Sequence, residues 1–480
     1  MRFLNPQSNP LEMTYNDVFL LPQYSDITSR MQVDITPGGN LGTTTPIVIA
    51  NMNAVAGKRM AETIARRGGL VILPQDMNWD RVQKTVQYIK SCHPLYETPV
   101  VLSEEETIQT ALNLIGKRSH GAVIVIDKEF RPVGIFTEKE ARNQDRHTSL
   151  KRVMRTDLIT VASSASAQDM FLILDKNRVS LLPVVYPDGT LAGVMTKKGA
   201  VRSTIYRPAQ NTDGHLLTAA AVGINKKLEA VVGFLMTIGV DIIVLDTAHG
   251  HQQRMLDAIR TVRKLIGPDR PLVAGNVVTG EATKDFIEAG ASIVKVGVGP
   301  GAMCTTRMAT GAGRPQFSAV LECSRVAREM GGSVWADGGV KHPRDVAIAL
   351  AAGASHAMVG SWFAGTHESV GDLLYDEQGR AYKENFGMAS KRAVIDRNDA
   401  AAIFEQAKRE YFEEGVSTSR MYLKKGSESA EDIVDSIAAG VRSACTYAGA
   451  RNLEEFYDKA VIGIQTAAGY TEGKPVSESW

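Results

Sequence analysis

The sequence predicts an α/β protein built on a closed (β/α)₈ barrel, and two observations support this. Short apolar runs recur along the chain, and a stretch of helix length with one apolar face follows many of them. Strands that are apolar throughout are typical of parallel sheets covered on both faces, so the alternation indicates a buried parallel sheet. Eight such units suit a barrel, and an open doubly wound sheet is the structural alternative.

The predicted strands are the apolar runs themselves. They cover residues 46–50, 69–73, 217–223, 241–246, 271–275, 292–297, 333–336 and 356–360. Helices with apolar residues at positions i, i+3 and i+4 are predicted at 58–68, 252–267, 281–290 and 342–353. Two further helices, at 400–412 and 429–449, are expected after the last strand.

An internal duplication interrupts the series between the second and third strands. Within residues 96–205, each copy runs strand, helix, strand, turn and strand, and then a threonine (Thr137, Thr196) opens a helix. Two copies side by side would bury a shared face. The predicted domains are therefore 1–94 for the first part of the barrel, 95–205 for the insertion, and 206–480 for the rest. The insertion is either a solubilising or oligomerising element or a regulatory nucleotide site in the cleft between the copies.

Composition excludes several functional classes. The chain has 480 residues, 44% hydrophobic and 22% charged, with a formal net charge of +1. Such a balance does not favour a nucleic acid or membrane surface as partner. The N-terminal residues have no apolar signal-peptide core, and no segment reaches transmembrane length. The four cysteines are far apart, which argues against a disulfide framework or a zinc site. The cytoplasm is the expected location.

The most informative segment follows the strand at 292–297 and reads GVGPGAMCTTR. A cysteine at the carboxyl end of a barrel strand lies where this architecture places its nucleophiles, so Cys304 is predicted to be a reactive thiolate. Glycines let the loop turn tightly, and carbonyls of Gly299, Gly301 and Cys304 are the expected ligands of a monovalent cation. The alternative is that Cys304 is merely a small buried apolar side chain.

Other strand ends predict the remaining contacts. Asp337-Gly338-Gly339 and Gly360-Ser361 end late strands, where glycines allow backbone N–H groups to approach a phosphate, and Asp337 is expected to accept from ribose hydroxyls. Cofactor or substrate contacts are expected at the ends of the strands at 241–246 and 271–275, from Asp246, Thr247, Ala248, Gly275 and Asn276. No GxGxxG motif follows a strand, so a dinucleotide would have to bind across the rim of the barrel.

These segments resemble the IMP dehydrogenase and GMP reductase family over nearly the whole chain. The matching motifs include TYNDVFLLPQYSDITSR, IANMNAV, DTAHGH, GVGPGAMCTTR, ADGG, AGASHAMVGS and GVRSACTYAGA. The resemblance implies a TIM barrel, a covalent bond between Cys304 and a purine nucleoside monophosphate (GMP or IMP), and hydride transfer to or from a nicotinamide cofactor. It adds Met52, Ala302, Gly387, Met388, Ala389, Ser390 and Gly415 to the substrate contacts. The insertion resembles a tandem CBS (Bateman) module, which implies a regulatory ATP or GTP and a homo-oligomer, either a tetramer or an octamer.

Within the family, the sequence favours a GMP reductase that uses NADPH and possesses a K⁺ site. GVRSACTYAGA resembles the reductase form, and Glu414 before Gly415 matches the glutamate that, with Thr306, assists the departure of the amine. Against this, the insertion favours a dehydrogenase, and Gln75 stands where reductases have a lysine. IMP dehydrogenase therefore remains the alternative, with Arg409 or Arg420 and a neighbouring tyrosine activating water. A nucleotide sensor without catalysis is the third possibility.

Overall fold

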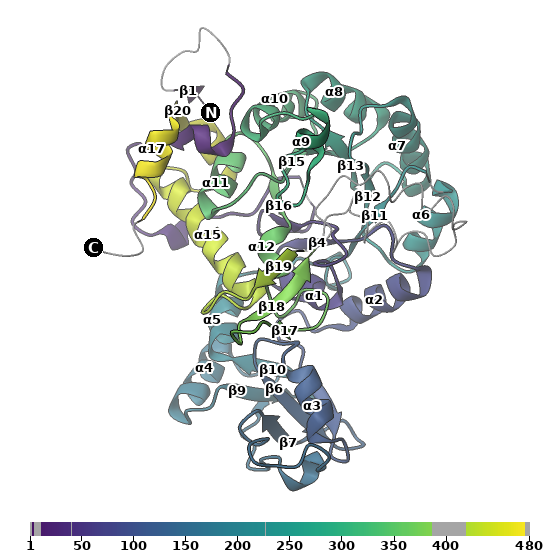
Figure 1. Ribbon diagram of the computed structural model, residues 1–480, viewed down its shortest axis with the longest axis vertical. Coiled ribbons are helices and arrows are strands. Elements are labelled where there is room, and N and C mark those ends of the chain that lie inside the picture. The colour runs from purple at the N-terminus through teal and green to yellow at the C-terminus, as the bar shows by residue number, and fades with distance from the viewer. Residues whose placement is uncertain (1, 4–10, 40, 226, 386–418, 476–480) are drawn as a thin grey trace.

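We analysed a computed structural model of the chain, which describes residues 2–3, 11–39, 41–225, 227–385 and 419–475 (Figure 1). Eight parallel strands form a closed barrel in the order β11-β12-β13-β14-β15-β16-β3-β4. They are β3 (Ile47–Ile49), β4 (Leu70–Leu73), β11 (Ala219–Val222), β12 (Ile242–Asp246), β13 (Leu272–Val277), β14 (Ile293–Val296), β15 (Ser333–Asp337) and β16 (His356–Val359). The predicted barrel is confirmed, and the alternative prediction of an open doubly wound sheet is wrong.

Helices surround the barrel because each strand is apolar on both faces. The outer layer contains α1 (Lys58–Arg66), α2 (Trp79–Ser91), α6 (Leu228–Thr237), α7 (Gln253–Ile266), α8 (Gly280–Ala289), α10 (Gln316–Glu329) and α11 (Pro343–Ala351). Their buried faces join the outward side chains of the strands in one hydrophobic core. A smaller cluster that includes Val48, Ile72 and Trp335 fills the barrel interior. Across the residues that the structure describes, every helix is too short or too polar to cross a lipid bilayer.

The last part of the chain packs on the outside of the barrel. Helix α15 (Ala430–Tyr447) confirms the prediction at 429–449 and contacts α1 and α11. It is followed by α16 (Leu453–Lys459), β20 (Val461–Ile464) and α17 (Ala467–Glu472). Strand β20 pairs with β1 (Arg2–Phe3) and β2 (Val18–Leu20), bringing the two ends of the chain together. The helix predicted at 400–412 lies outside the described residues.

The inserted segment projects from one end of the barrel (Figure 1). Its first copy contains β5 (Val100–Ser103), α3 (Ile108–Ile115), β6 (Ala122–Ile126) and β7 (Pro132–Thr137). Its second contains β8 (Val161–Ala162), α4 (Ala167–Lys176), β9 (Leu181–Val185), β10 (Leu191–Thr196) and α5 (Lys197–Ile205). Each copy forms a three-stranded sheet, and apolar residues of both copies meet in one cluster that includes Ile124, Ile135 and Val194. The shared face predicted from the duplication is therefore present.

One prediction within the insertion is wrong. Thr196 caps α5 by accepting a hydrogen bond from the backbone of Gly199, but Thr137 is followed by turns instead of a helix. Its hydroxyl instead donates to Glu140 Oε2 at 2.5 Å. The segment after Thr137 has few apolar residues to bury, and Asn143 adopts a left-handed conformation with φ of 59°. Both features oppose a helix.

Candidate functional site

The predicted nucleophile lies at the carboxyl rim of the barrel, in the loop after β14. Cys304 is exposed, and its Sγ lies 3.2 Å from Thr306 Oγ1 at the start of the short helix α9 (Thr306–Thr310). The cysteine N–H donates to the carbonyl of Gly301 at 3.1 Å, which closes the turn. The two side chains predicted to act together are thus in contact, and the thiol faces open space.

Glycines bring this loop against the end of β15. Gly338 and Gly339 have φ of 85° and 79°, and a Cβ on Gly338 would lie 3.1 Å from the nitrogen of Gly301. The N–H of Gly339 donates to the carbonyl of Pro300 at 3.1 Å. The cysteine loop and the Asp337-Gly338-Gly339 turn therefore form one surface. The residues predicted to bind the phosphate and the monovalent cation are neighbours on this surface.

Met52 and Gly360 meet on the adjoining part of the rim. A Cβ on Gly360 would lie 2.7 Å from Met52 Sδ, so a larger residue here would displace the methionine side chain. Ser361 follows as the first residue of the short helix α12 (Ser361–Ala364). This places three predicted substrate contacts on the ends of β16 and β3, beside the turn after β15.

A buried lysine that the sequence analysis did not assign joins the predicted cofactor and substrate residues. Lys295 on β14 is 2% exposed, and its Nζ lies 2.8 Å from Asp246 Oδ1 and 2.9 Å from Asp337 Oδ2. It also donates to Asn276 Oδ1, and Asn276 Nδ2 donates to Asp337 at 2.9 Å. Burial alone would lower the pKa of Lys295, but Asp246 and Asp337 raise it, so the ammonium stays charged.

This network fixes the geometry of the rim. Asn51 at the end of β3 donates to Asp246 Oδ2 at 2.8 Å, so the network reaches across the barrel mouth. Thr247 and the Gly275-Asn276 pair are held by reciprocal backbone hydrogen bonds of 2.9 Å. Ala248, next to Thr247, is exposed, and so is Ala302 in the cysteine loop. A lysine inside the apolar strand SIVKVG was the sequence signal for this network, because a buried lysine requires partners.

The remaining predicted residues lie outside the described part of the chain. These are Glu414, with Gly387, Met388, Ala389, Ser390 and Gly415. The described strands on either side of them belong to a small sheet of β17 (Leu374–Tyr375), β18 (Ala381–Asn385) and β19 (Ser419–Tyr422). Ser419 Oγ lies 3.8 Å from Met303 Sδ, so this sheet is in contact with the cysteine loop.

A lysine in this sheet gives the protein a pH-dependent stability. Lys383 on β18 is 1% exposed and donates to the carbonyls of His367 and Ser369 at 2.9 and 2.8 Å. Burial, and then the charge of Arg59, lowers its pKa to about 7. Between pH 7 and pH 10 the unfolded chain therefore binds more protons than the folded one, and stability rises with pH.

We expect this effect to appear as a difference between the wild type and Lys383→Met. From pH 7 to pH 9 the free energy of unfolding of the wild type should increase relative to the variant by about 2 kcal/mol. Urea unfolding of both proteins at the two pH values measures this. A difference that does not change with pH would mean that Lys383 titrates normally.

Among the four cysteines, we expect only Cys304 to react with an alkylating agent. Burial raises the pKa of Cys92, Cys323 and Cys445 to about 12, whereas Cys304 is exposed. We expect iodoacetamide at pH 8 to modify Cys304 alone, since alkylation requires an accessible thiolate. Peptide mass mapping, with Cys304→Ser as the control, measures this. Equal labelling of Cys92, which is half-buried, would contradict it.

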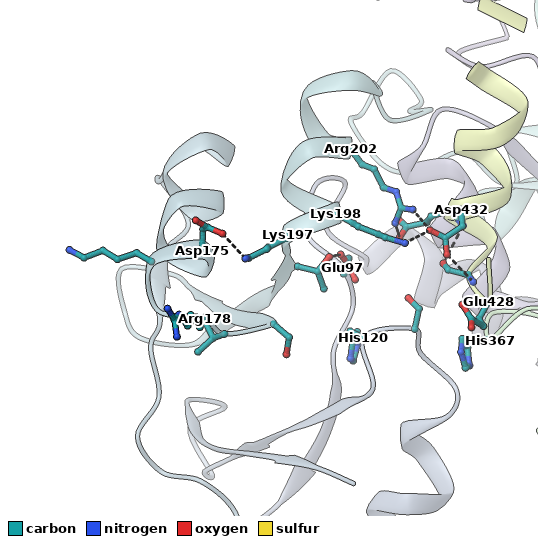
Figure 2. Close-up of a pocket in the computed structure, with 17 residues that line it drawn as sticks. Glu97, His120, Asp175, Arg178, Lys197, Lys198, Arg202, His367, Glu428 and Asp432 are labelled. Atoms are coloured by element: carbon teal, nitrogen blue, oxygen red, sulfur yellow. Dashed lines mark hydrogen bonds and ion pairs between the residues drawn. The ribbon is translucent and has the colours of Figure 1, made fainter. Parts of the chain in front are cut away.

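A cavity lies between the insertion and the barrel, apart from the rim that holds Cys304 (Figure 2). Its volume is about 1030 Å³. Its walls combine Ser119 and His120 of the first copy, several residues of α4 and α5 in the second copy, and residues from outside the insertion, namely His367, Glu428, Ser429, Glu431 and Asp432. Thr196 lines it, and Thr137 is not among its lining residues. Barrel residues were not predicted to take part.

Glu97 fills the space left by Gly199 in this cavity. A Cβ on Gly199 would lie 2.3 Å from Glu97 Oε1, and Thr196 Oγ1 donates to the same oxygen at 2.7 Å. Burial, and then the nearby Glu431, raises the pKa of Glu97. The carboxyl group of Glu97 therefore occupies the space that a side chain at position 199 would take.

Charged contacts join this cavity to the barrel. Arg202 on α5 donates to Glu431 at 3.0 Å and to Asp432 at 2.6 Å, both at the start of α15 (Figure 2). Glu431 also accepts from Arg67 at 2.7 Å. These ion pairs are almost fully buried, so removing one partner would leave an uncompensated charge. The insertion is therefore joined to the rest of the protein by buried ion pairs.

Comparison with known proteins agrees with this architecture. A family model described as the IMP dehydrogenase / GMP reductase domain matches residues 12–476. The chain is 51% identical over 481 residues to GMP reductase of Mycobacterium tuberculosis (strain ATCC 25618 / H37Rv), covering 100% of both chains. It is 37% identical over 472 residues to inosine-5'-monophosphate dehydrogenase of Staphylococcus aureus (strain NCTC 8325 / PS 47), covering 96% of this chain and 95% of the relative.

A solved structure is also similar. It is a cysteine-to-alanine variant of GMP reductase from Trypanosoma brucei in complex with guanosine 5'-monophosphate, with a TM-score of 0.68 and 30% sequence identity. The match covers 98% of this chain and 99% of that one. The resemblance inferred from the sequence motifs is therefore confirmed.

Proposed function

The chain belongs to the IMP dehydrogenase / GMP reductase family of oxidoreductases, and we propose that it is a GMP reductase, which converts GMP to IMP and ammonia with NADPH as reductant. The choice of GMP reductase over IMP dehydrogenase rests on sequence identity. The chain is 51% identical to a GMP reductase over its full length and 37% identical to a dehydrogenase. That reductase aligns along its whole length, insertion included, so the insertion no longer favours the dehydrogenase. The proposed role is the interconversion of purine nucleotides.

The proposed reaction begins with Cys304. As a thiolate it adds to C2 of GMP, forming a C–S bond, and the amine then leaves C2 as ammonia after taking up a proton. When bound, NADPH supplies the hydride that C2 gains. The C–S bond then breaks and the thiolate departs with its electron pair, giving IMP. The exposed position of Cys304 at the barrel rim supports its role as nucleophile.

Proton delivery is assigned to Thr306 and Glu414. The contact of 3.2 Å between Thr306 Oγ1 and Cys304 Sγ places the hydroxyl beside the carbon that the thiolate attacks. Glu414 precedes Ser419 by five residues, a span of at most about 18 Å of chain. Because Ser419 contacts Met303 next to the cysteine, this tether is short enough for the carboxyl group to reach the site. Glu414 would then protonate the leaving amine through Thr306.

The rim residues fit the groups that the reaction requires. Gly339, Gly360 and Ser361 would hold the phosphate of GMP, beside Met52 and Ala302, and Asp337 would accept from the ribose. Asp246, Thr247, Ala248, Gly275 and Asn276 would hold the nicotinamide cofactor on the opposite side of Lys295, where the buried network keeps their positions fixed. For K⁺, the carbonyls of Gly299, Gly301 and Cys304 are the proposed ligands, since a tight glycine loop can turn them inward.

The geometry of β19 argues against the dehydrogenase alternative that uses Arg420. Successive side chains of a strand point to opposite faces, and Ser419 faces the cysteine loop. Arg420 therefore faces away, and its guanidinium lies 5.2 Å from the ring centre of Tyr382. It cannot activate water at Cys304 without a change in the register of the strand. Arg409 lies outside the described residues.

For the insertion, we propose a tandem CBS module that binds a regulatory purine nucleotide, ATP or GTP. The cavity in Figure 2 supports this, because Lys176, Arg178 and Lys197 can pair with phosphates while Glu97 and Thr196 can bind hydroxyl groups. Since the cavity also includes barrel residues, its ligand would act on the docking of the insertion. A homotetramer or homo-octamer is the proposed assembly.

The reductase assignment is tested by following the nitrogen atom of the 2-amino group of GMP. GMP labelled with ¹⁵N on its 2-amino group should release labelled ammonia in step with the oxidation of NADPH. Oxidation of NADPH without release of the label would refute the proposed reaction.

A further inference from the structure

Lys295 connects the two groups of residues that are proposed to bind GMP and the nicotinamide cofactor. Its ammonium lies 2.8 Å from Asp246, which is assigned to the cofactor, and 2.9 Å from Asp337, which is assigned to the ribose of GMP. It also donates to Asn276 Oδ1, so all three N–H donors of the ammonium are in use. One buried cation therefore serves both ligand sites.

The two carboxylates reach the mouth of the barrel, but the ammonium does not. The side chain of Lys295 is 2% exposed, whereas those of Asp246 and Asp337 are 19% and 22% exposed. The lysine packs closely against the neighbouring strand β13, since a Cβ on Gly275 would lie 2.5 Å from Lys295 Cβ. Any effect of Lys295 on ligand binding therefore passes through the carboxylates.

Both carboxylates depend on the same positive charge. Because both contacts are made to one nitrogen, the two accepting oxygens lie less than about 6 Å apart, a distance at which like charges repel each other. Lys295 and its two carboxylates carry one net negative charge together, and without the lysine they would carry two. Since GMP and NADPH are anions, the second negative charge would weaken the binding of both.

Neutral amides hold the carboxylates in place without balancing their charge. Asn276 Nδ2 donates to Asp337 Oδ2 at 2.9 Å, and Asn51 Nδ2 donates to Asp246 Oδ2 at 2.8 Å. Asn276 Nδ2 also donates to the carbonyl of Gly297 at 2.6 Å, which fixes the amide between the strands. The orientation of each carboxylate would therefore be partly kept if the ammonium were removed, and the charge would be the main loss.

We infer that Lys295 is a positioning residue shared by the two ligand sites, so that a change of charge at one site alters the binding of the ligand at the other. The inference rests on the proposed function, which assigns Asp337 to GMP and Asp246 to NADPH. It goes beyond that function because it makes the two affinities depend on one buried charge.

The test removes the lysine together with each carboxylate in turn. Lys295→Gln should raise the Kd of GMP and the Kd of NADPH by about tenfold to a hundredfold, the range expected for the loss of a charged partner. In Lys295→Gln/Asp246→Asn the net charge is that of the wild type, so the Kd of GMP should return to within a few-fold of the wild type while that of NADPH stays high. Lys295→Gln/Asp337→Asn should restore NADPH binding and leave GMP binding weak.

Calorimetric titration of GMP and fluorescence titration of NADPH, each without the other ligand, measure these constants. The matched control is Lys90→Gln, because Lys90 pairs with Asp241, which precedes β12 at the end opposite to Asp246. It should leave both Kd values unchanged. If Lys295→Gln does not fold, the two double variants carry the test, since each keeps the wild-type net charge.

Two results would overturn the inference. One is GMP binding that is as weak in Lys295→Gln/Asp246→Asn as in Lys295→Gln, which would mean that the carboxylates do not share the ammonium. The other is recovery of both ligands in both double variants, which would mean that Lys295 only maintains the fold. A failure of the proposed function is distinguishable, because the wild type would then not oxidise NADPH in the presence of GMP, whereas the titrations require no turnover.

Discussion

Replacing Cys304 with alanine should abolish turnover of GMP and leave GMP binding within a few-fold of the wild type. The thiolate is the only group in the account that bonds to C2, so no slower route through the same intermediate remains. Binding should survive because the proposed phosphate and ribose contacts come from other strands, at Gly360, Ser361 and Asp337. Steady-state assays together with calorimetric titration of GMP measure the two properties separately.

The control for this variant is Cys445→Ala. Cys445 is fully buried on α15, away from the rim, so its loss should lower stability without affecting the reaction. Residual activity of Cys304→Ala within tenfold of the wild type would contradict covalent catalysis. Loss of GMP binding along with activity would mean that the cysteine loop had collapsed, and Cys304→Ser would then be the variant to compare.

Replacing Glu414 with glutamine should lower kcat by about 10²- to 10⁴-fold, the usual contribution of a general acid, while the KM for GMP should change little. The amide has nearly the shape of the carboxyl group but cannot deliver a proton to the leaving amine. The measurement is kcat and KM for GMP at saturating NADPH, with ammonia release followed in parallel.

Glu413→Gln is the matched control, because the two glutamates are adjacent in the sequence. The account expects Glu413→Gln to retain nearly full activity. The reverse result, with Glu413 essential and Glu414 dispensable, would identify Glu413 as the general acid in place of Glu414. Full activity of both variants would refute the proton-delivery step assigned to this segment.

The barrel was predictable from the sequence because its strands carry the signal themselves. Runs such as DIIVLD and SIVKVG are apolar on both faces, which only a covered parallel sheet accommodates, and β12 and β14 formed there. Cys304 and Thr306 were also predictable, since two residues of spacing in one loop bring their side chains into contact. The helix after Thr137 was predicted by analogy between the two copies, and the local residues did not support it.

The features that the sequence did not predict depend on contacts between distant segments. The buried network of Lys295 joins five strands, and no local pattern shows that Asp246, Asn276 and Asp337 share one ammonium. Likewise, Glu97 reaches the space beside Gly199 because its backbone pairs with the distant Val194 of β10. Such contacts are set by tertiary packing, which residue type and periodicity do not determine.

The central claim is that this chain reduces GMP, and the absorbance of reduced nicotinamide at 340 nm tests it directly. Purified protein is mixed in parallel with GMP plus NADPH and with IMP plus NAD. The account predicts that absorbance falls in the first mixture and that nothing changes in the second. A rise in the second mixture with no change in the first would contradict it and identify the protein as an IMP dehydrogenase.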